Sequence, residues 1–415
     1  MEAAAGPVII GGGLAGGLLA LALRELGAEV TLIEAPAAKA VGSAGAVGSA
    51  TAAGAATSVR SDVRSDASVR SATAISYGAV PGWPLAATPL ARLAAGAPRL
   101  WRGLQRRHGA LGWRTAALRL HGENPALRGL SRLGALPFAQ VDTALLDRRW
   151  PELLAAAGVE RISAAVEQME PQPAGGSMLT LADGRVIRAA VVVLAAGSGC
   201  RRLWPELPSR LRSSWAGVLE LPAFPVALGR RACWLPQRFV RVPLERRAAQ
   251  LQAPAWVVDP GLVPRGDGAL LGQLTLVRPA LEPGRPPEAA EAEQLLRQAL
   301  AAEPWGSPLA ALPGELRQAA VAFCRDGVPL VGPVAAGIWA FTGFSAGFSQ
   351  APVLAPLLAR CLVGQGWDGD GGRWSGRWSG RWRQAGVRGE GRDTSSAQAQ
   401  IRLQRLGVWP AAAQG

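Results

Sequence analysis

The stretch Val8-Ile9-Ile10-Gly11-Gly12-Gly13-Leu14-Ala15-Gly16-Gly17 decides how this chain folds. It places glycines at the three positions of a G-x-G-x-x-G motif, which are Gly11, Gly13 and Gly16. An apolar strand precedes the motif, a helical segment follows it, and a second strand over residues 29–34 comes next. This order predicts a βαβ unit that binds a dinucleotide. The alternative is a glycine-rich turn in a buried apolar hairpin.

Each position of the motif has a physical reason. Gly11 permits the tight turn, Gly13 lets a pyrophosphate approach the backbone, and Gly16 lets helix and strand pack closely. Leu14 and Ala15 begin the helix, whose free N–H groups and positive dipole end favour a phosphate.

The acidic residue Glu34 ends the second strand, 18 residues after Gly16, where its carboxylate can bind ribose hydroxyls. NAD and FAD proteins share this motif, but its place near the start of the sequence is typical of FAD enzymes, whose fold is completed by distant segments. Residues 191–196 are a candidate segment of this kind, an apolar strand that ends in small residues. Taken alone, they are simply a buried parallel strand.

Composition limits the chemistry open to side chains. Hydrophobic residues make up 49% of the chain, which is enough for a sizeable core. Tyr77 is the only tyrosine, Lys39 the only lysine, and His108 and His121 the only histidines. A histidine-rich metal site is excluded, no metal is predicted, and a bound cofactor is expected to carry any reaction.

The four cysteines are too far apart for a zinc or redox pair, so we expect buried free thiols of a reducing compartment. No signal peptide or membrane span is predicted, because glycines interrupt the apolar N-terminal stretch and no basic residue precedes it. The expected location is the cytoplasm. Residues 36–72 (Ala/Gly/Ser-rich) and 365–415 (Gly/Arg/Trp-rich) are expected to be mobile.

Five stretches, in this order, resemble the D-amino-acid oxidase/glycine oxidase group of FAD-dependent amine oxidases. They are the N-terminal unit with Glu34, residues 142–169, residues 183–197, residues 263–272, and residues 325–345, which contain Arg-Asp-Gly-Val-Pro-Leu-Val-Gly-Pro and then Phe-Thr-Gly-Phe-Ser. The last stretch is the most specific of the five, and the order of all five is more specific still.

The resemblance implies an α/β fold, with an FAD-binding Rossmann-like domain of the two-dinucleotide-binding type assembled from discontinuous segments. It also implies an α+β substrate domain, or cap, with an antiparallel sheet. The expected FAD-binding segments are residues 1–87, 158–212 and 320–364, with 36–72 as a low-complexity insert. The expected cap comprises residues 88–157 and 213–319, and residues 365–415 are the tail.

The resemblance also implies site residues and a reaction. The ADP half of FAD would be held by Gly11, Gly13, Leu14, Ala15, Gly16 and Glu34, the adenine by the backbone of Val166, the pyrophosphate and ribose by Ala196 and Gly197, and the isoalloxazine by Gly343, Phe344 and Ser345. The flavin N5 takes a hydride from the carbon that bears an amine, in a small amine or amino acid, and dioxygen or another acceptor then reoxidises the flavin.

One departure concerns the substrate. Amino-acid oxidases of this group carry a carboxylate-binding arginine five residues before the Asp of their Asp-Gly-x-Pro motif, and Val321 stands there. Arg325, about 13 Å further along an extended segment, does not simply replace it. Weak substrate candidates are Arg325, Arg241 (in an expected cap strand) and Tyr77, each with the alternative of a solvated or packing side chain. The substrate is then not a simple α-amino acid, or the cap binds its carboxylate.

Three other functions stay open. The first is an FAD-fold domain acting on a modified nucleoside amine in tRNA, because the net charge of +14 and the Arg/Trp-rich tail suit phosphate contact and stacking. It is not favoured, since base composition and slippage also produce such repeats. The second is a flavin-binding protein without turnover, and the third is a membrane-surface dehydrogenase that passes electrons to a quinone.

Overall fold

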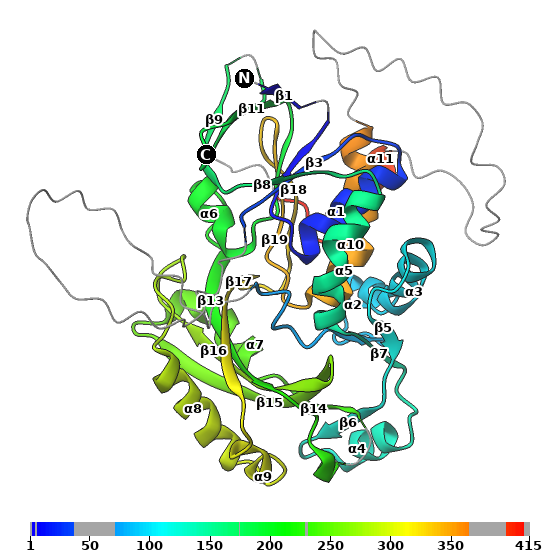
Figure 1. Cartoon of the computed structure of the whole chain (residues 1–415), viewed down its shortest axis with the longest axis vertical. Coiled ribbons are helices and arrows are strands. Elements are labelled where there is room, and N and C mark those ends of the chain that lie inside the picture. Colours follow the sequence, from blue (N-terminus) through cyan, green and yellow to red (C-terminus); the bar gives the residue numbers. More distant parts are fainter. Residues whose placement is uncertain are drawn as a thin grey trace, which may run out of the picture.

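The computed structural model describes residues 2–4, 6–36, 71–173, 175–228, 231–364 and 396–410 of the 415-residue chain. The expectations for residues 37–70 and 365–395 therefore lie outside the described residues. Figure 1 shows two halves, an upper half built on a mainly parallel sheet and, at the bottom, the expected cap.

A six-stranded sheet forms the centre of the upper half. In spatial order its strands are β18 (Leu330–Ala335), β19 (Ile338–Thr342), β12 (Val192–Leu194), β2 (Val8–Ile10), β3 (Thr31–Glu34) and β8 (Glu160–Ser163). All neighbouring pairs are parallel except β18–β19. Leu194 of β12 pairs with both Ile10 and Ala340, so strands far apart in sequence end at the same edge of the sheet.

Both faces of this sheet are covered. One face packs against α1 (Leu14–Glu25), α5 (Thr143–Ala156) and α10 (Gly347–Val363). The other face packs on a second sheet, whose strands in order are β1 (Glu2–Ala3), β11 (Val186–Ala189), β10 (Ser177–Leu181) and β9 (Val166–Pro171). Burial on both faces explains why the inner strands β2 and β12 are continuously apolar. The predicted α/β Rossmann-like fold is confirmed.

The cap is built on a second six-stranded sheet. Its strands in order are β17 (Glu315–Cys324), β13 (Leu211–Leu221), β16 (Gly268–Val277), β15 (Ala255–Arg265), β14 (Cys233–Pro236) and β6 (Leu118–His121). All pairs are antiparallel except β14–β6. The expected antiparallel sheet of the cap is therefore present. The helix α8 (Ala289–Ala301) covers the outer face, and the inner face is turned toward the loop that contains Tyr77.

The remaining elements are short. They are β4 (Ala79–Pro81), α2 (Pro89–Ala94), α3 (Ala97–His108), β5 (Trp113–Thr115), α4 (Pro125–Arg132), β7 (Phe138–Val141), α6 (Cys200–Leu203), α7 (Arg241–Arg246), α9 (Ser307–Ala310) and three 3₁₀ turns (Gly197–Gly199, Val226–Leu228 and Ala248–Gln250). The expected domain division stays a proposal. Contacts favour moving α2, α3 and α5 from the cap to the upper half, since they pack against α1 and α10.

The expectation of a wholly mobile tail is wrong for residues 396–410. Helix α11 (Ser396–Arg405) packs on α10 and buries Ala399 and Leu403, which lie four residues apart on one helical face. The backbone then extends along β18, where the Val331 N–H donates to the Val408 carbonyl oxygen at 3.0 Å. A narrow apolar stripe therefore anchors a segment whose composition is otherwise polar and basic.

Two further expectations need correction. Arg241 does not lie in a cap strand but begins α7. The sequence spacing of Leu, Trp and Arg over residues 88–120 predicts helix throughout, whereas strands follow His108. The expected state of the cysteines is confirmed, because Cys200, Cys233, Cys324 and Cys361 are all buried and unbridged. No helix among the described residues is long and apolar enough to cross a membrane.

Candidate functional site

The turn between β2 and α1 is a cradle that only glycine can form. Gly11 has a φ of +113°, and a Cβ added there would lie 2.5 Å from the Ala195 carbonyl oxygen. A Cβ at Gly16 would lie 1.9 Å from the Gly11 carbonyl oxygen, so the close helix–strand approach predicted for this position is present. At Gly13 a Cβ would meet only Thr73 Oγ1, at 3.4 Å, which leaves the front of the turn open.

The N-terminus of α1 suits an anion. Its N-cap is Gly13, which offers no side-chain cap, and no acidic residue lies in the first turn. The Leu14 N–H donates to Thr73 Oγ1 at 3.1 Å, so Thr73 lies beside the turn. Ala15 lies in the first turn of the helix, beside Leu14. Apart from that of Leu14, the first N–H groups of this turn are a ready anion site.

Glu34 lies over the same turn. A Cβ added at Gly12 would lie 2.4 Å from the Glu34 carboxyl carbon, so the carboxylate rests against the glycine loop. Arg161 of β8 pairs with it, with Nη2 at 3.3 Å from Oε2. The Glu34 side chain keeps 41% of its surface exposed, which leaves it accessible to a ribose.

The segment after β12 passes directly behind the cradle. The Ala195 N–H donates to the Ile10 carbonyl oxygen at 2.9 Å, and Ala196 contacts Gly11. Gly197 follows with a φ of +57°. Val166 lies at the start of β9, where its carbonyl oxygen accepts a hydrogen bond from Arg202 Nη2 at 3.1 Å. An adenine would therefore share the Val166 backbone with Arg202.

The third predicted segment, Gly343 to Ser345, joins β19 to α10. Gly343 has a φ of +78° and lies against Cys324, whose Sγ would be 2.5 Å from an added Cβ. Phe344 packs edge-on against Phe341, with ring centroids 4.9 Å apart. The Ser345 Oγ is buried and has no hydrogen-bond partner among the described residues.

The N-termini of α1 and α10 meet at this edge. A Cβ added at Gly347 would lie 3.4 Å from Leu14 Cδ2, so the first turns of the two helices touch. Neither first turn carries an acidic side chain. Two positive helix ends and a glycine cradle at the carboxyl edge of a parallel sheet fit a long anionic dinucleotide such as FAD.

A buried polar group on the cap faces the loop before α10. We define the Arg241 group as Tyr77, Arg241, Glu245 and Asp259. Arg241 Nη2 donates to the Ser345 carbonyl oxygen at 2.9 Å, and Nη1 donates to Glu245 Oε1 at 3.1 Å. Asp259 Oδ2 lies 3.8 Å from Arg241 Nε. Tyr77, another weak substrate candidate, lies near this ion pair, because its ring is against Gly261, two residues after Asp259.

Local structure explains why Asp259 faces α7 and why the Tyr77 ring lies against the same strand. A β-bulge interrupts the pairing of β15 with β16 between Asp259 and Leu262, and such bulges redirect side chains. The redirected Asp259 carboxylate accepts the Val240 and Arg241 N–H groups at the start of α7. At Gly261, in the same bulge, a Cβ would lie 2.9 Å from Tyr77 Oη, so only glycine leaves room for this ring.

Burial controls the protonation of the Arg241 group. Desolvation raises the pKa of Asp259 to about 6, against the lowering effect of Arg241, and it also raises the pKa of Glu245. Burial, with a smaller effect of Asp259, raises the pKa of Tyr77 well above its ordinary value. Tyr77 therefore stays a neutral hydroxyl, and its oxygen has no hydrogen-bond partner among the described residues.

The rest of the inner face of the cap sheet is apolar. The cluster packed around Tyr77 contains Ala216, Val218, Leu235, Val263, Leu270 and Ala319, with Phe239 and Val321 packed against it. Val321 thus lies in the layer that also holds the Tyr77 ring. Arg317, on the same strand, donates to Glu220 Oε2 at 2.8 Å.

The third weak candidate, Arg325, lies apart from these contacts and stays a prediction. It is exposed, one residue past the end of β17, and its backbone N–H donates to the Arg210 carbonyl oxygen at 2.9 Å. Extended geometry carries it away from Val321, as its spacing indicated. The structure does not join it to the Arg241 group.

Other polar candidates have structural roles. His108 lies 3.2 Å from Glu25, and His121 contacts the Pro260 carbonyl oxygen at 2.8 Å, with its pKa lowered to about 4 by burial.

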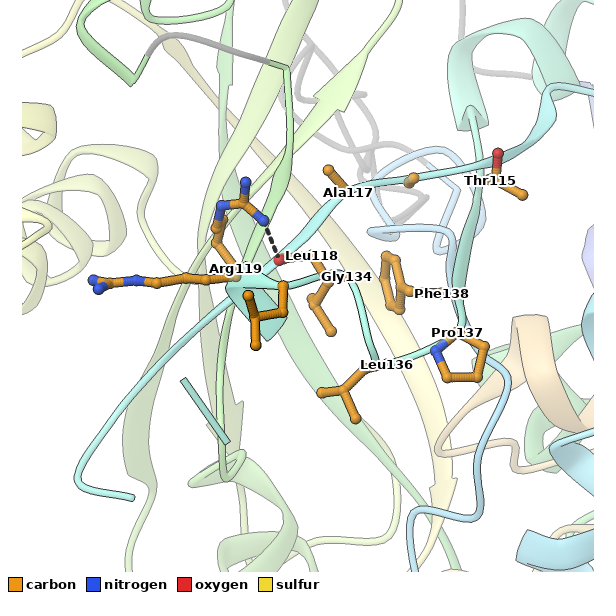
Figure 2. Close-up of a pocket in the computed structure, with 11 residues that line it drawn as sticks. Thr115, Ala117, Leu118, Arg119, Gly134, Leu136, Pro137 and Phe138 are labelled. Carbon is orange, nitrogen blue, oxygen red and sulfur yellow. Dashed lines mark hydrogen bonds between the residues drawn. The ribbon is translucent and has the colours of Figure 1, made fainter. Parts of the chain in front are cut away.

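A cavity of about 400 Å³ opens beside Leu118, Leu136 and Phe138, whose side chains surround it in Figure 2. Its lining contains arginines but no acidic residue, so it offers no paired acid and base.

Sequence reasoning missed five residues of this site: Thr73, Arg161, Arg202, Glu245 and Asp259. Two of them left a readable signal. Arg241 and Glu245 have the four-residue spacing of a helical ion pair, and Asp259 is a lone acid after two valines in an apolar strand. Thr73 and Arg202 belong to the site through tertiary contacts, which leave no local pattern in the sequence.

Comparisons with known proteins agree with this architecture. A family model for lycopene cyclase proteins matches residues 99–213, and a search of curated proteins by sequence found no match. Among solved structures, glycine oxidase from Geobacillus kaustophilus is 18% identical over 88% of this chain and 95% of that chain, with a TM-score of 0.57. Iminodiacetate oxidase from Chelativorans sp. BNC1 is 17% identical over 86% and 94%, with a TM-score of 0.57.

L-proline dehydrogenase from P. horikoshii is 12% identical over 88% of this chain and 94% of that chain, with a TM-score of 0.61. These likenesses span nearly the whole length of each protein, and at this identity they concern the fold. They agree with the resemblance that the order of the sequence motifs indicated. The chain therefore has the fold shared by glycine oxidase, iminodiacetate oxidase and L-proline dehydrogenase.

Proposed function

We propose that this chain is an FAD-dependent oxidoreductase that oxidises the C–N bond of a small amine. One observation carries the proposal. The N-termini of α1 and α10 touch at the carboxyl edge of the parallel sheet, directly under a cap face with one buried polar group. A dinucleotide laid along that edge would have its anionic half at α1 and its reactive ring under the cap.

The residues that would hold FAD have distinct tasks. Gly11, Gly13 and Gly16 keep side chains out of the path of the pyrophosphate, and Leu14 and Ala15 present the first N–H groups of α1. Glu34 would bind the ribose, with Arg161 orienting its carboxylate. Gly343, Phe344 and Ser345 would support the ring, and the positive end of α10 would stabilise negative charge there.

When bound, FAD supplies the redox chemistry, because its N5 accepts a hydride from the carbon that bears the amine. The chain then has to bind the amine, orient it and exclude water. The apolar layer around Val321 and Phe239 excludes water, and the Arg241 group is the polar part of the same face. Dioxygen or another acceptor would reoxidise the flavin.

The absorption spectrum of the purified protein tests the cofactor. We expect a flavin band, and its bleaching under anaerobic conditions by members of a panel of small amines. Gly13→Val should lose the flavin while the protein stays folded, because the added side chain points into open space in front of the turn. A colourless protein that gains no flavin band when FAD is added would refute the proposal.

A further inference from the structure

We propose that the Arg241 group selects an amine whose nitrogen-bearing carbon carries no carboxylate, with an apolar alkyl or arylalkyl body. This inference rests on the proposed function and narrows its substrate class. It concerns what Tyr77, Arg241, Glu245 and Asp259 can recognise together.

The guanidinium of Arg241 is committed to the protein. Nη1 donates to Glu245, Nη2 donates to the Ser345 carbonyl oxygen, and Nε faces Asp259 at 3.8 Å. A two-pronged bond with a substrate carboxylate needs two free N–H groups on one edge of the guanidinium. Nη1 and Nη2 are hydrogen-bonded, and Nε, which has no hydrogen-bond partner among the described residues, faces the Asp259 carboxylate, so a substrate carboxylate on that edge would have to lie beside a resident one.

The charge of the Arg241 group also disfavours a carboxylate. With Glu245 and Asp259 both ionised, the group carries one net negative charge, and with one of them protonated it carries none. Tyr77 stays neutral because burial raises its pKa. While at least one of the two carboxylates is ionised the group is not positive, so it does not attract a carboxylate, and with both ionised it attracts an ammonium.

The surrounding surface supplies no second anchor. Val321 occupies the layer packed around Tyr77, with Ala216, Val218 and Ala319 nearby. Arg317 and Arg265 both bind Glu220, and Arg265 Nε also donates to the Ala74 carbonyl oxygen at 3.2 Å. The apolar layer fits a hydrocarbon body, and the Tyr77 hydroxyl is a buried polar group that a substrate can satisfy.

The role of Arg241 follows from the same contacts. It fixes the cap to the loop before α10 and sets the charge of the group, so it is a positioning residue. Phe239 stacks on it, with the guanidinium carbon 5.6 Å from the ring centroid, which further restricts its movement.

Calorimetric binding to the full-length holoenzyme tests the proposal. The probes are 2-phenylethylamine, phenylalanine in both enantiomers, and 3-phenylpropionate, which share one apolar body. We expect the amine to bind at least about tenfold more tightly than either phenylalanine, and the acid to bind more weakly still. Equal or tighter binding of phenylalanine or the acid, or no measurable binding of the amine, would overturn the proposal.

Two variants and one control assign the preference to the group. Asp259→Asn and Glu245→Gln each remove one negative charge and should reduce the preference for the amine over phenylalanine. Glu293→Gln removes the same kind of four-residue ion pair from α8, on the outer face of the cap, and should leave the preference unchanged. An unchanged ratio in both test variants would show that selection lies elsewhere.

The outcomes separate this inference from the proposed function. A protein that binds no FAD but prefers the amine would refute the oxidoreductase and keep the selectivity of the group. A flavoprotein that is reduced by amino acids in preference to amines would keep the oxidoreductase and refute the selectivity.

Discussion

The glycine cradle at α1 and the Arg241 group on the cap are built on different principles. The cradle is made of backbone, with Gly11 and Gly16 lying where no side chain fits. The Arg241 group is made of side chains drawn from a loop, a helix and a bulged strand. The first is rigid and generic to dinucleotides, and the second depends on charges that burial and partners control. The four predictions below test this contrast.

The largest effect is expected from Gly16→Val. The added Cβ would lie 1.9 Å from the Gly11 carbonyl oxygen, so the helix and strand must separate. We expect loss of several kcal/mol of stability and loss of flavin binding, measured by thermal unfolding and by the absorption spectrum. Gly129→Ala in α4, where an added Cβ meets nothing within 4 Å, is the control and should be tolerated. A folded, yellow Gly16→Val protein would show that the cradle adapts.

Arg241→Met should act on the cap side through charge. It leaves Glu245 and Asp259 buried without their cation, and breaking a buried pair in this way costs about 3 kcal/mol of unfolding free energy. Arg149→Met, which removes an exposed ion pair with Glu152, should cost less than about 1 kcal/mol. Chemical denaturation measures both variants. Equal small losses would mean that water screens the Arg241 group.

The contrast also explains which parts of the site the sequence could predict. The cradle and Glu34 were predictable because Gly11, Gly13 and Gly16 are required by local backbone geometry, which leaves a pattern in the sequence. Gly343 to Ser345 were identified through the order of motifs, and the parallel sheet brings them to the same edge.

The Arg241 group escaped prediction for a physical reason. Asp259 reaches Arg241 only because a bulge in β15 redirects it, and bulges have no reliable local signal. Arg241 was placed in a strand, which hid its helical spacing to Glu245. In the same way, the composition of α11 predicts mobility, because the helix is polar and buries only two residues, Ala399 and Leu403.

A pH titration of stability sharpens the comparison on the cap side. Burial raises the pKa of Asp259 from 3.8 to about 6, so the folded chain binds this proton more tightly than the unfolded chain. The group therefore stabilises the fold below about pH 4, and this stabilisation is lost as the pH rises through about 6. A shift of about two units corresponds to about 3 kcal/mol.

The difference in unfolding free energy between the parent protein and Asp259→Asn measures this effect, because other titrating groups cancel. We expect the parent to lose stability relative to Asp259→Asn between pH 4 and 7. Glu245 changes in the same direction, since burial raises its pKa too, and Tyr77 does not titrate in this range. A difference that stays constant with pH would contradict burial of the Asp259 carboxyl.

The smallest effect is expected where the cradle does use a side chain. Thr73 Oγ1 accepts the Leu14 N–H at 3.1 Å, and Thr73→Val removes this acceptor while keeping the shape of the side chain. Loss of one hydrogen bond at a helix N-terminus costs about 1 kcal/mol. We expect that loss in the unfolding free energy of the protein freed of FAD, and a weaker effect in the loaded protein if phosphate oxygens take over the freed N–H. Ser71→Ala, which removes a hydroxyl that accepts the Ala74 N–H in the same turn, controls for disturbance of the loop. If Thr73→Val lowered the unfolding free energy equally with and without FAD, the phosphate would lie away from the Leu14 N–H. Phosphate binding by the backbone cradle would then not depend on the loop that contains Thr73.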